Sequence, residues 1–186
     1  MLQVPLPLPE WARTSVDSSR VFTGDAEKMA FTVGLARRNV EQGIGGPFGA
    51  AIFNRASGEL VSVGVNLVVA AINSVLHAEM VAIMLAEAKL ESFTLAARGR
   101  YELFTSCEPC AMCLGGILWS GVERLVCAAA AEDAREIGFD EGPVFPESYR
   151  YLEQRGIEVV RGVMGDEGRV VLELYRSLGG VLYNRM

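Results

Sequence analysis

The spacing of apolar positions along the chain predicts an alternation of helices and strands. In residues 25–42, Met29, Val33 and Val40 recur at the spacing of one helix face. By the same spacing, or because a stretch has few breakers, helices are predicted over residues 25–42, 78–90, 109–119, 132–137, 146–154 and 168–178. Shorter apolar runs predict strands over residues 48–53, 60–66, 101–105, 122–128 and 157–160.

The order of these elements predicts a single α/β domain. A mixed, five-stranded central sheet covered by helices on both faces, a three-layer α/β/α sandwich, accommodates all of them. The chain contains no internal repeat and no linker, so residues 1–186 form one domain in this interpretation. It begins with a proline-rich arm over residues 1–22 and ends with a segment from about residue 140 to residue 186.

Composition narrows the kind of protein and its partners. Of the 186 residues, 51% are hydrophobic and 22% are charged, which is typical of a globular protein. The net charge is −6 and no basic stripe is present, so a small substrate is expected and nucleic acid is not. The amino terminus lacks a basic, signal-like region, and polar residues interrupt the apolar stretch 61–85. We therefore expect a cytoplasmic protein without a membrane span, in which clustered cysteines bind metal or act chemically.

The only histidine of the chain, His77, provides the strongest indication of chemistry. Cys110 and Cys113 follow it at a spacing that puts both sulfurs on one face of a predicted helix, within its first turn. The helix dipole there favours thiolate over thiol. One imidazole and two thiolates would form a zinc site whose fourth position is open, as catalytic zinc requires.

Glu79 lies two residues beyond His77 and projects in a different direction from the predicted helix. It is better placed to reach a water in the open position than to bind the metal, and a carboxylate there would accept a proton. Other interpretations compete with this one. A lone histidine is usually a core or surface residue, and a Cys-x-x-Cys pair is often structural or redox-active. Cys107 offers a third thiolate, although we expect it to pack near the site without ligating.

Together, His77-Ala78-Glu79 and Pro109-Cys110-Ala111-Met112-Cys113 resemble the signature of the cytidine-deaminase-like zinc hydrolases. The resemblance extends from about Gly46 to Tyr183. It implies the cytidine-deaminase-like fold, one zinc ion per subunit, and hydrolytic release of an exocyclic amine as ammonia from a cytosine, adenine or guanine ring. His77, Cys110 and Cys113 would hold the zinc, and Glu79 would transfer protons.

Finer motifs are similar to those of bacterial guanine deaminases. They are Gly46-Pro47-Phe48-Gly49-Ala50, Asn66, the segment from Ser106 to Cys113, Ile137-Gly138-Phe139-Asp140-Glu141 and the tail Val181-Leu182-Tyr183-Asn184-Arg185. This resemblance implies conversion of guanine to xanthine, and a homodimer in which the segment after the last core strand covers an active site, commonly the partner's.

The same resemblance assigns roles around the ring. Asn66 would hydrogen-bond the purine, Phe48 would pack on its face, and Glu141 would meet its N–H edge as a second catalytic carboxylate. Asp140 would assist Glu141. An exposed helix-capping acid is the alternative for both carboxylates, and for Asp140 it is an equal one. Two further substrate contacts are expected. Tyr183 would belong to a lid, with a docked tail residue that does not contact the ligand as its alternative. Trp119 would line the pocket, with a core position as its alternative.

Several alternatives are open from the sequence. A bulky Leu76 precedes His77 where many relatives have smaller residues or proline, a departure that bears on which ring is bound and not on the chemistry. The alternatives are deaminases of another base, a nucleoside, a pterin or an aminated triazine, and a transfer-RNA adenosine deaminase. A structural zinc or thiol module without turnover is the alternative from a different class.

Overall fold

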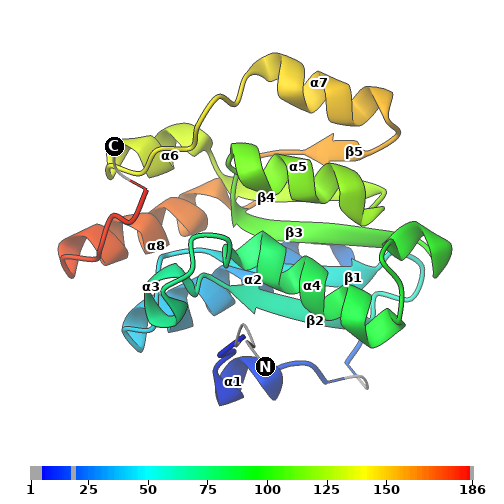
Figure 1. Cartoon of the computed structure of the whole chain (residues 1–186), viewed down its shortest axis with the longest axis horizontal. Helices are drawn as coiled ribbons and strands as arrows, with labels where there is room; N and C mark the ends of the chain where they lie inside the picture. The colour runs from blue at the N-terminus through cyan, green and yellow to red at the C-terminus, as the bar shows by residue number, and fades with distance from the viewer. Residues whose placement is uncertain (1–5, 18–19, 185–186) are drawn as a thin grey trace, which may run out of the picture.

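The computed structural model describes residues 6–17 and 20–184, which fold around a mixed five-stranded sheet (Figure 1). Its order is β2-β1-β3-β4-β5. The strands are β1 (Gly49–Asn54), β2 (Leu60–Val65), β3 (Tyr101–Cys107), β4 (Arg124–Ala129) and β5 (Glu158–Val160). β1 pairs antiparallel with both of its neighbours, while β3, β4 and β5 run parallel to one another.

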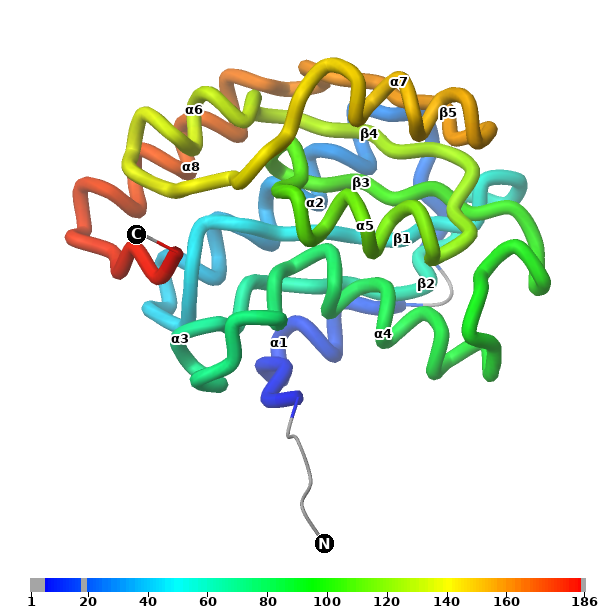
Figure 2. The backbone as a smooth tube through the Cα atoms, turned by 45° about the horizontal axis from the view of Figure 1, so that its top comes forward, coloured from blue at the N-terminus to red at the C-terminus, as the bar shows by residue number. Residues whose placement is uncertain are grey.

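Helices cover both faces of the sheet, so the predicted three-layer sandwich is confirmed (Figures 1 and 2). One face carries α2 (Gly24–Glu41) and α8 (Gly165–Ser177), and the other carries α4 (Ala78–Leu90), α5 (Ala111–Ser120) and α7 (Pro146–Gln154). Neighbouring residues of a strand point to opposite faces, so Phe104 joins the first core layer and Leu103 the second. The shorter helices are α1 (Glu10–Arg13), α3 (Val68–Ala71), α6 (Ala131–Glu136) and the 3₁₀ helix Leu95–Ala97.

Every predicted helix and strand is present, with bounds that differ by up to three residues. The helix expected from residue 109 begins at Ala111, because Cys110 adopts extended backbone as its N-cap. The elements missing from the prediction, α1, α3 and the 3₁₀ helix, span three or four residues each and are too short to show a helical period.

The amino-terminal arm predicted over residues 1–22 is only partly described, since residues 1–5 and 18–19 lie outside the described residues. Its helix α1 packs on the body through buried Ala12, and the Arg38 guanidinium lies 4.7 Å from the Trp11 ring centroid. Arg185 of the predicted tail is also outside the described residues. Across the described ranges, no helix has both the length and the apolar character needed to cross a membrane.

The amino termini of α4 and α5 are held against the same region of the sheet. β3 leads directly into α5 through residues 108–110, and α4 begins where its first turn touches β2. At Gly64 of β2, a Cβ atom would lie 1.9 Å from the Ala78 carbonyl oxygen and 2.7 Å from the Ala82 nitrogen. Only glycine permits this approach, so the sequence itself fixes how closely the start of α4 sits on the sheet.

Candidate metal centre and adjoining cavity

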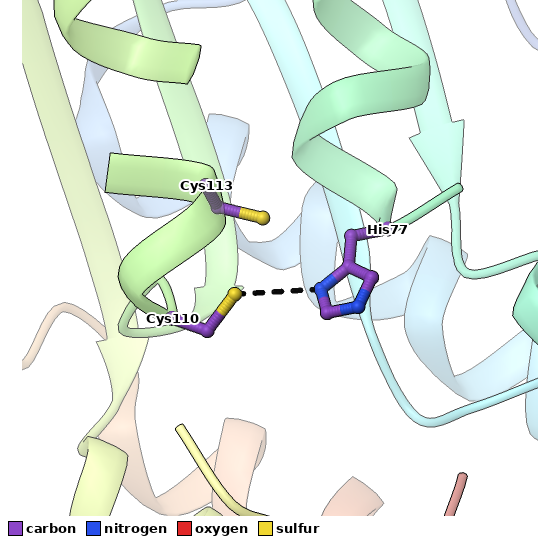
Figure 3. A group of neighbouring side chains, drawn as sticks. All are labelled: His77, Cys110 and Cys113. Atoms are coloured by element: carbon purple, nitrogen blue, oxygen red, sulfur yellow. Dashed lines mark hydrogen bonds between the residues drawn. The ribbon is translucent and has the colours of Figure 1, made fainter. Parts of the chain in front are cut away.

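His77, Cys110 and Cys113 converge from the beginnings of two helices (Figure 3). His77 is the N-cap of α4, Cys110 is the N-cap of α5, and Cys113 lies in the first turn of α5. One ligand atom from each residue lies within 4.8 Å of the other two, and Cys110 Sγ is 3.5 Å from His77 Nδ1. The sequence prediction that these three side chains meet is therefore reproduced in space.

The electrostatics of this cluster prepare it for a cation. A hydrogen bond from Cys113, together with the nearby His77, lowers the pKa of Cys110 to about 4. The same bond and burial raise the pKa of Cys113 well above its ordinary value. Burial alone would lower the pKa of His77, but the Cys110 thiolate and nearby carboxylates raise it overall. One imidazole and two sulfurs at this spacing fit zinc, which favours nitrogen and thiolate ligands and displaces the shared protons.

Cys107 lies beside the cluster without joining it. Its side chain is buried, and its Sγ is 3.5 Å from the Ala130 carbonyl oxygen, toward which the thiol donates. Burial raises the pKa of this thiol well above its ordinary value, so it stays protonated. Among the described residues, the candidate ligand group contains His77, Cys110 and Cys113 and no fourth protein ligand. Three protein ligands leave one tetrahedral position for water or substrate.

Glu79 is buried directly behind the metal ligands. Its Oε1 accepts a hydrogen bond from the Thr105 hydroxyl at 3.2 Å, and its Oε2 accepts one from Cys113 Sγ at 3.4 Å. Burial, reinforced by the Cys110 thiolate and opposed by His77, raises the pKa of this carboxyl. A carboxyl group with a raised pKa beside a metal cluster is suited to accept and return protons near neutral pH.

A small cavity adjoins the cluster. Its volume is about 10 Å³, and it is lined by Phe48, His77, Glu79, Glu108, Cys110, Glu141, Tyr183 and Asn184. Glu141 is buried, and burial together with the Cys110 thiolate raises its pKa to about 8. The structure thus brings Phe48, Glu141 and Tyr183 to the metal cluster, as the sequence predicted.

The carboxy-terminal tail lies over this cavity and contacts residues predicted to bind the ring. The side-chain amide of Asn66 donates to the Tyr183 hydroxyl at 2.7 Å, and Asn66 Oδ1 accepts from the backbone of Gly46 and Val68. Asn184 Nδ2 donates to the Asp140 carbonyl oxygen. At Gly138, just after α6, a Cβ would lie 2.8 Å from Leu182 Cδ1, so the tail runs back beside this segment. Tyr183 and Asn184 of the tail therefore line the cavity of their own chain in this structure.

Three predicted substrate contacts, Asn66, Asp140 and Trp119, do not line the cavity. Asn66 is buried and reaches it only through its hydrogen bond to Tyr183. The Asp140 side chain is exposed, and its carboxylate accepts the Gly142 N–H at 2.8 Å, a local turn and not the helix cap that was its alternative. Trp119 is 75% exposed near the opposite end of α5, nine residues beyond Cys110. At 1.5 Å per residue, that places the two residues about 13 Å apart along the helix axis. Leu76 is buried in the core and does not line the cavity.

The structure also adds residues that the sequence prediction missed. Phe139 packs between Phe48 and Tyr183, with ring centroids 5.1 Å from each, and its position beside the predicted Glu141 was the available signal. Glu108 is buried in the cavity wall and accepts hydrogen bonds from Arg161 and Tyr149. Arg161 and Tyr149 lie more than 40 residues from Glu108 along the chain, so no local sequence pattern predicts that they contact it.

Comparisons with known proteins agree with this geometry. Guanine deaminase of Bacillus subtilis (strain 168) is 40% identical over 125 residues, which cover 67% of this chain and 77% of that protein. A crystal structure in complex with 2,6-diaminopurine superimposes with a TM-score of 0.92 at 42% identity, covering 98% of this chain and 97% of the other. For a guanine deaminase from Nitrosomonas europaea, the TM-score is 0.88 at 41% identity, with 95% and 97% coverage.

The family described as the cytidine and deoxycytidylate deaminase zinc-binding region matches residues 23–129. That match spans α2 through β4, and it includes the histidine, both cysteines and the buried glutamate of the cluster. A zinc-dependent hydrolase explains the open fourth position better than a closed structural site does. The sequence, the fold and the geometry of the three candidate ligands together establish that this chain belongs to the zinc-dependent cytidine and deoxycytidylate deaminase family.

Proposed function

We propose that this chain hydrolyses guanine to xanthine and ammonia. The observation that carries the proposal is the second buried carboxylate, Glu141, which shares the cavity with Glu79 and the metal cluster. Guanine presents adjacent ring and exocyclic N–H donors, and a carboxylate acceptor complements them. The guanine deaminases among the relatives, and the neighbour that holds 2,6-diaminopurine, support a purine of this kind. One water is consumed for each ammonia released.

In the proposed mechanism, His77, Cys110 and Cys113 hold the zinc ion. Bound zinc would acidify a water molecule and orient it. Glu79 accepts the proton of the attacking water, passes it to a ring nitrogen and later protonates the leaving amine. The burial of Glu79 suits this exchange, because a raised carboxyl pKa makes both protonation states accessible.

The ring is bound by the cavity walls. Asn66 offers the side-chain amide that now donates to Tyr183, and Phe48, which lines the cavity, packs against the base. Glu141 accepts from the N–H edge, and the Tyr183 ring covers the site. Asp140 and Trp119 are not included in this proposal, because their side chains lie away from the cavity.

A substrate panel tests the proposal. Ammonia release is measured with the zinc-loaded protein on guanine, guanosine, adenine, cytosine, cytidine and aminated triazines. We expect guanine to be turned over far faster than the others. Efficient turnover of another ring with none of guanine would overturn the substrate assignment. Inosine formation in a transfer RNA, measured in parallel, would instead support an RNA substrate.

Glu79→Gln tests the mechanism separately from the substrate. Glutamine keeps the shape of the side chain but cannot accept the proton, so we expect bound zinc to be unchanged and turnover to fall by roughly 10²- to 10⁴-fold. Zinc per chain is measured by atomic absorption beside ammonia release. Glu87→Gln, on the carboxyl-terminal half of α4, is the matched control and should behave as wild type. Near-normal turnover by Glu79→Gln would contradict the proposed mechanism.

We further infer a homodimer in the cytoplasm that has no nucleic-acid partner. Met112 and Trp119, seven residues apart on one stripe of α5, are 36% and 75% exposed, and such an apolar stripe is suited to a second copy. All four cysteines are free thiols, which suits a reducing compartment. The net charge of −6 disfavours nucleic acid. Sedimentation of wild type and Trp119→Ser tests the dimer, which should dissociate in the variant.

A further inference from the structure

A threonine hydroxyl inside the sheet contacts the carboxylate of Glu79. Thr105 lies on β3, the central strand between β1 and β4 (Figure 1), and its side chain is 1% exposed. Its Oγ1 donates to Glu79 Oε1 at 3.2 Å. A hydroxyl buried among apolar side chains is costly without a partner, and here the carboxylate is that partner.

The backbone around Thr105 is held on both sides. Thr105 pairs with Ala50 of β1 and with Cys127 of β4, so its Cα position is fixed at the centre of the sheet. A β-branched side chain on such a strand has few accessible χ1 rotamers. The hydroxyl is consequently presented in a fixed direction, toward the first turn of α4 where Glu79 lies.

The second contact of the Glu79 carboxylate changes once the site is loaded. Cys113 donates its thiol proton to Glu79 Oε2 at 3.4 Å. As a metal ligand, Cys113 is a thiolate and has no proton to donate. The Thr105 hydroxyl has no such competing role and keeps its hydrogen bond. Of the two side-chain hydrogen bonds that the Glu79 carboxylate accepts, the one from Thr105 is therefore the one that remains when both cysteines are ligands.

We propose that Thr105 is a positioning residue for Glu79, holding its carboxylate in the orientation in which it exchanges protons. The inference rests on the proposed function, because it assigns a role in that same reaction. Thr105 acts through Glu79 and does not touch the ring. Its loss should therefore slow the chemical step and leave ring binding unchanged.

Three variants separate positioning from packing. Thr105→Val keeps the shape and removes the donor, whereas Thr105→Ser keeps the donor and removes a methyl group. Thr32→Val is the matched control, since Thr32 is an equally buried threonine whose hydroxyl donates to the Lys28 carbonyl within α2. Steady-state kinetics of ammonia release, zinc per chain and thermal unfolding are measured for each holoenzyme.

We expect Thr105→Val to lower kcat by about 10- to 100-fold with KM almost unchanged, the scale that follows from misplacing a reacting group. Thr105→Ser should retain most of the wild-type kcat, and Thr32→Val should retain all of it. Zinc content should equal that of wild type throughout. Wild-type kcat in Thr105→Val, an equal loss in Thr105→Ser, or zinc loss in Thr105→Val would each overturn the proposal.

A crystal structure of zinc-loaded Thr105→Val gives an answer independent of turnover. We expect the Glu79 side chain in another rotamer or spread over several, with His77, Cys110 and Cys113 unmoved. A Glu79 carboxylate in its present position would overturn the positioning role. If wild type released no ammonia from any ring, the proposed function would fail, while this structure would still decide whether Thr105 orients Glu79.

Discussion

At the scale of single residues, the neighbours Asp140 and Glu141 have opposite environments. Glu141 is buried in the cavity wall, while Asp140 is exposed and caps a turn. Above its pKa of about 8, Glu141 is the charged acceptor proposed for the ring, and Glu141→Gln removes that charge. We expect kcat/KM for guanine to fall by about 10- to 100-fold, since a hydrogen bond to a charged group contributes about 1.5–3 kcal/mol.

Asp140→Asn is the matched control for Glu141→Gln. Asparagine keeps an oxygen that accepts the Gly142 N–H, so kinetics and stability should match wild type. Both variants are compared by steady-state ammonia release at one zinc loading. The assignment of the ring contact to Glu141 would be wrong if Asp140→Asn lost activity and Glu141→Gln did not.

The sequence predicts the metal residues because their identity is itself the signal. A single histidine, His77, and the Cys110/Cys113 pair at first-turn spacing leave few other zinc sites. Trp119 shows the limit of such reasoning, because the sequence gives the identity of an aromatic side chain but not the direction in which it points. Thr105 gives no signal, because a strand threonine is ordinary until the fold sets a carboxylate opposite it.

At the scale of elements, Gly64 controls where α4 sits. A methyl group at this position would lie 1.9 Å from the Ala78 carbonyl oxygen, so Gly64→Ala must push α4 away from β2. We expect a loss of about 1–3 kcal/mol in the free energy of unfolding, as for other overpacked cores. Zinc content and turnover should fall with it, because His77 and Glu79 move with the start of the helix.

Gly34→Ala provides the comparison for Gly64→Ala. Gly34 lies within α2, and a Cβ there would have no atom within 4 Å. Alanine should stabilise this helix by about 0.5–1 kcal/mol through its higher propensity. Urea unfolding and atomic absorption measure both variants. Unchanged zinc content in Gly64→Ala would show that the contact with Ala78 does not set the metal site.

The sequence predicts α2 from its apolar period and α4 from a run of helix-forming residues with few breakers. Strand order depends on contacts between distant segments, and no period encodes it. The close contact between Gly64 and Ala78 shows why. Nothing in the sequence indicates that this strand position requires glycine until the fold places Ala78 against it. The family resemblance implied the cytidine-deaminase-like fold, but it did not predict this contact.

At the scale of the whole molecule, an ion cluster joins the layers away from the cavity. Arg124 of β4 forms two hydrogen bonds with Asp25 of α2, at 2.8 and 2.7 Å, and also reaches Glu102 and Glu158. The Arg124 guanidinium holds the pKa of Asp25 below its ordinary 3.8. A carboxyl whose pKa is lower in the folded than in the unfolded protein stabilises the fold at any pH above its unfolded-state pKa. This contribution is lost as the pH falls through its folded-state pKa.

Asp25→Asn should therefore be less stable than wild type at pH 7, with the difference shrinking below pH about 4. Thermal unfolding of both proteins between pH 7 and pH 3 measures it. The raised pKa values of Glu79 and Glu141 change the free energy of unfolding with pH in the opposite direction. They do so equally in wild type and Asp25→Asn, so they cancel in the difference. Asp166→Asn, in an exposed pair with Arg169, is the control and should follow wild type. A constant difference across the range would contradict the assignment.

The tail couples the end of the chain to the catalytic cavity. Its base is anchored where Gly180 lies against the Tyr175 ring, so close that a Cβ would be 2.3 Å from that ring. Beyond it, the Tyr183 hydroxyl accepts from Asn66 Nδ2 at 2.7 Å, and the remaining cavity of about 10 Å³ is far too small for a purine. We therefore predict that guanine displaces Tyr183 from Asn66 when it binds.

This competition predicts opposite effects from two changes in the tail. Tyr183→Phe keeps the covering ring but removes a hydrogen bond worth about 0.5–1.5 kcal/mol, so KM for guanine should fall by up to about 10-fold with kcat retained. Ending the chain after Leu178 removes the cover itself, admits water and should lower kcat. Steady-state kinetics with zinc content as the control measure both. A higher KM in Tyr183→Phe would show instead that the hydroxyl binds the ring, because only a lost substrate contact changes KM in that direction.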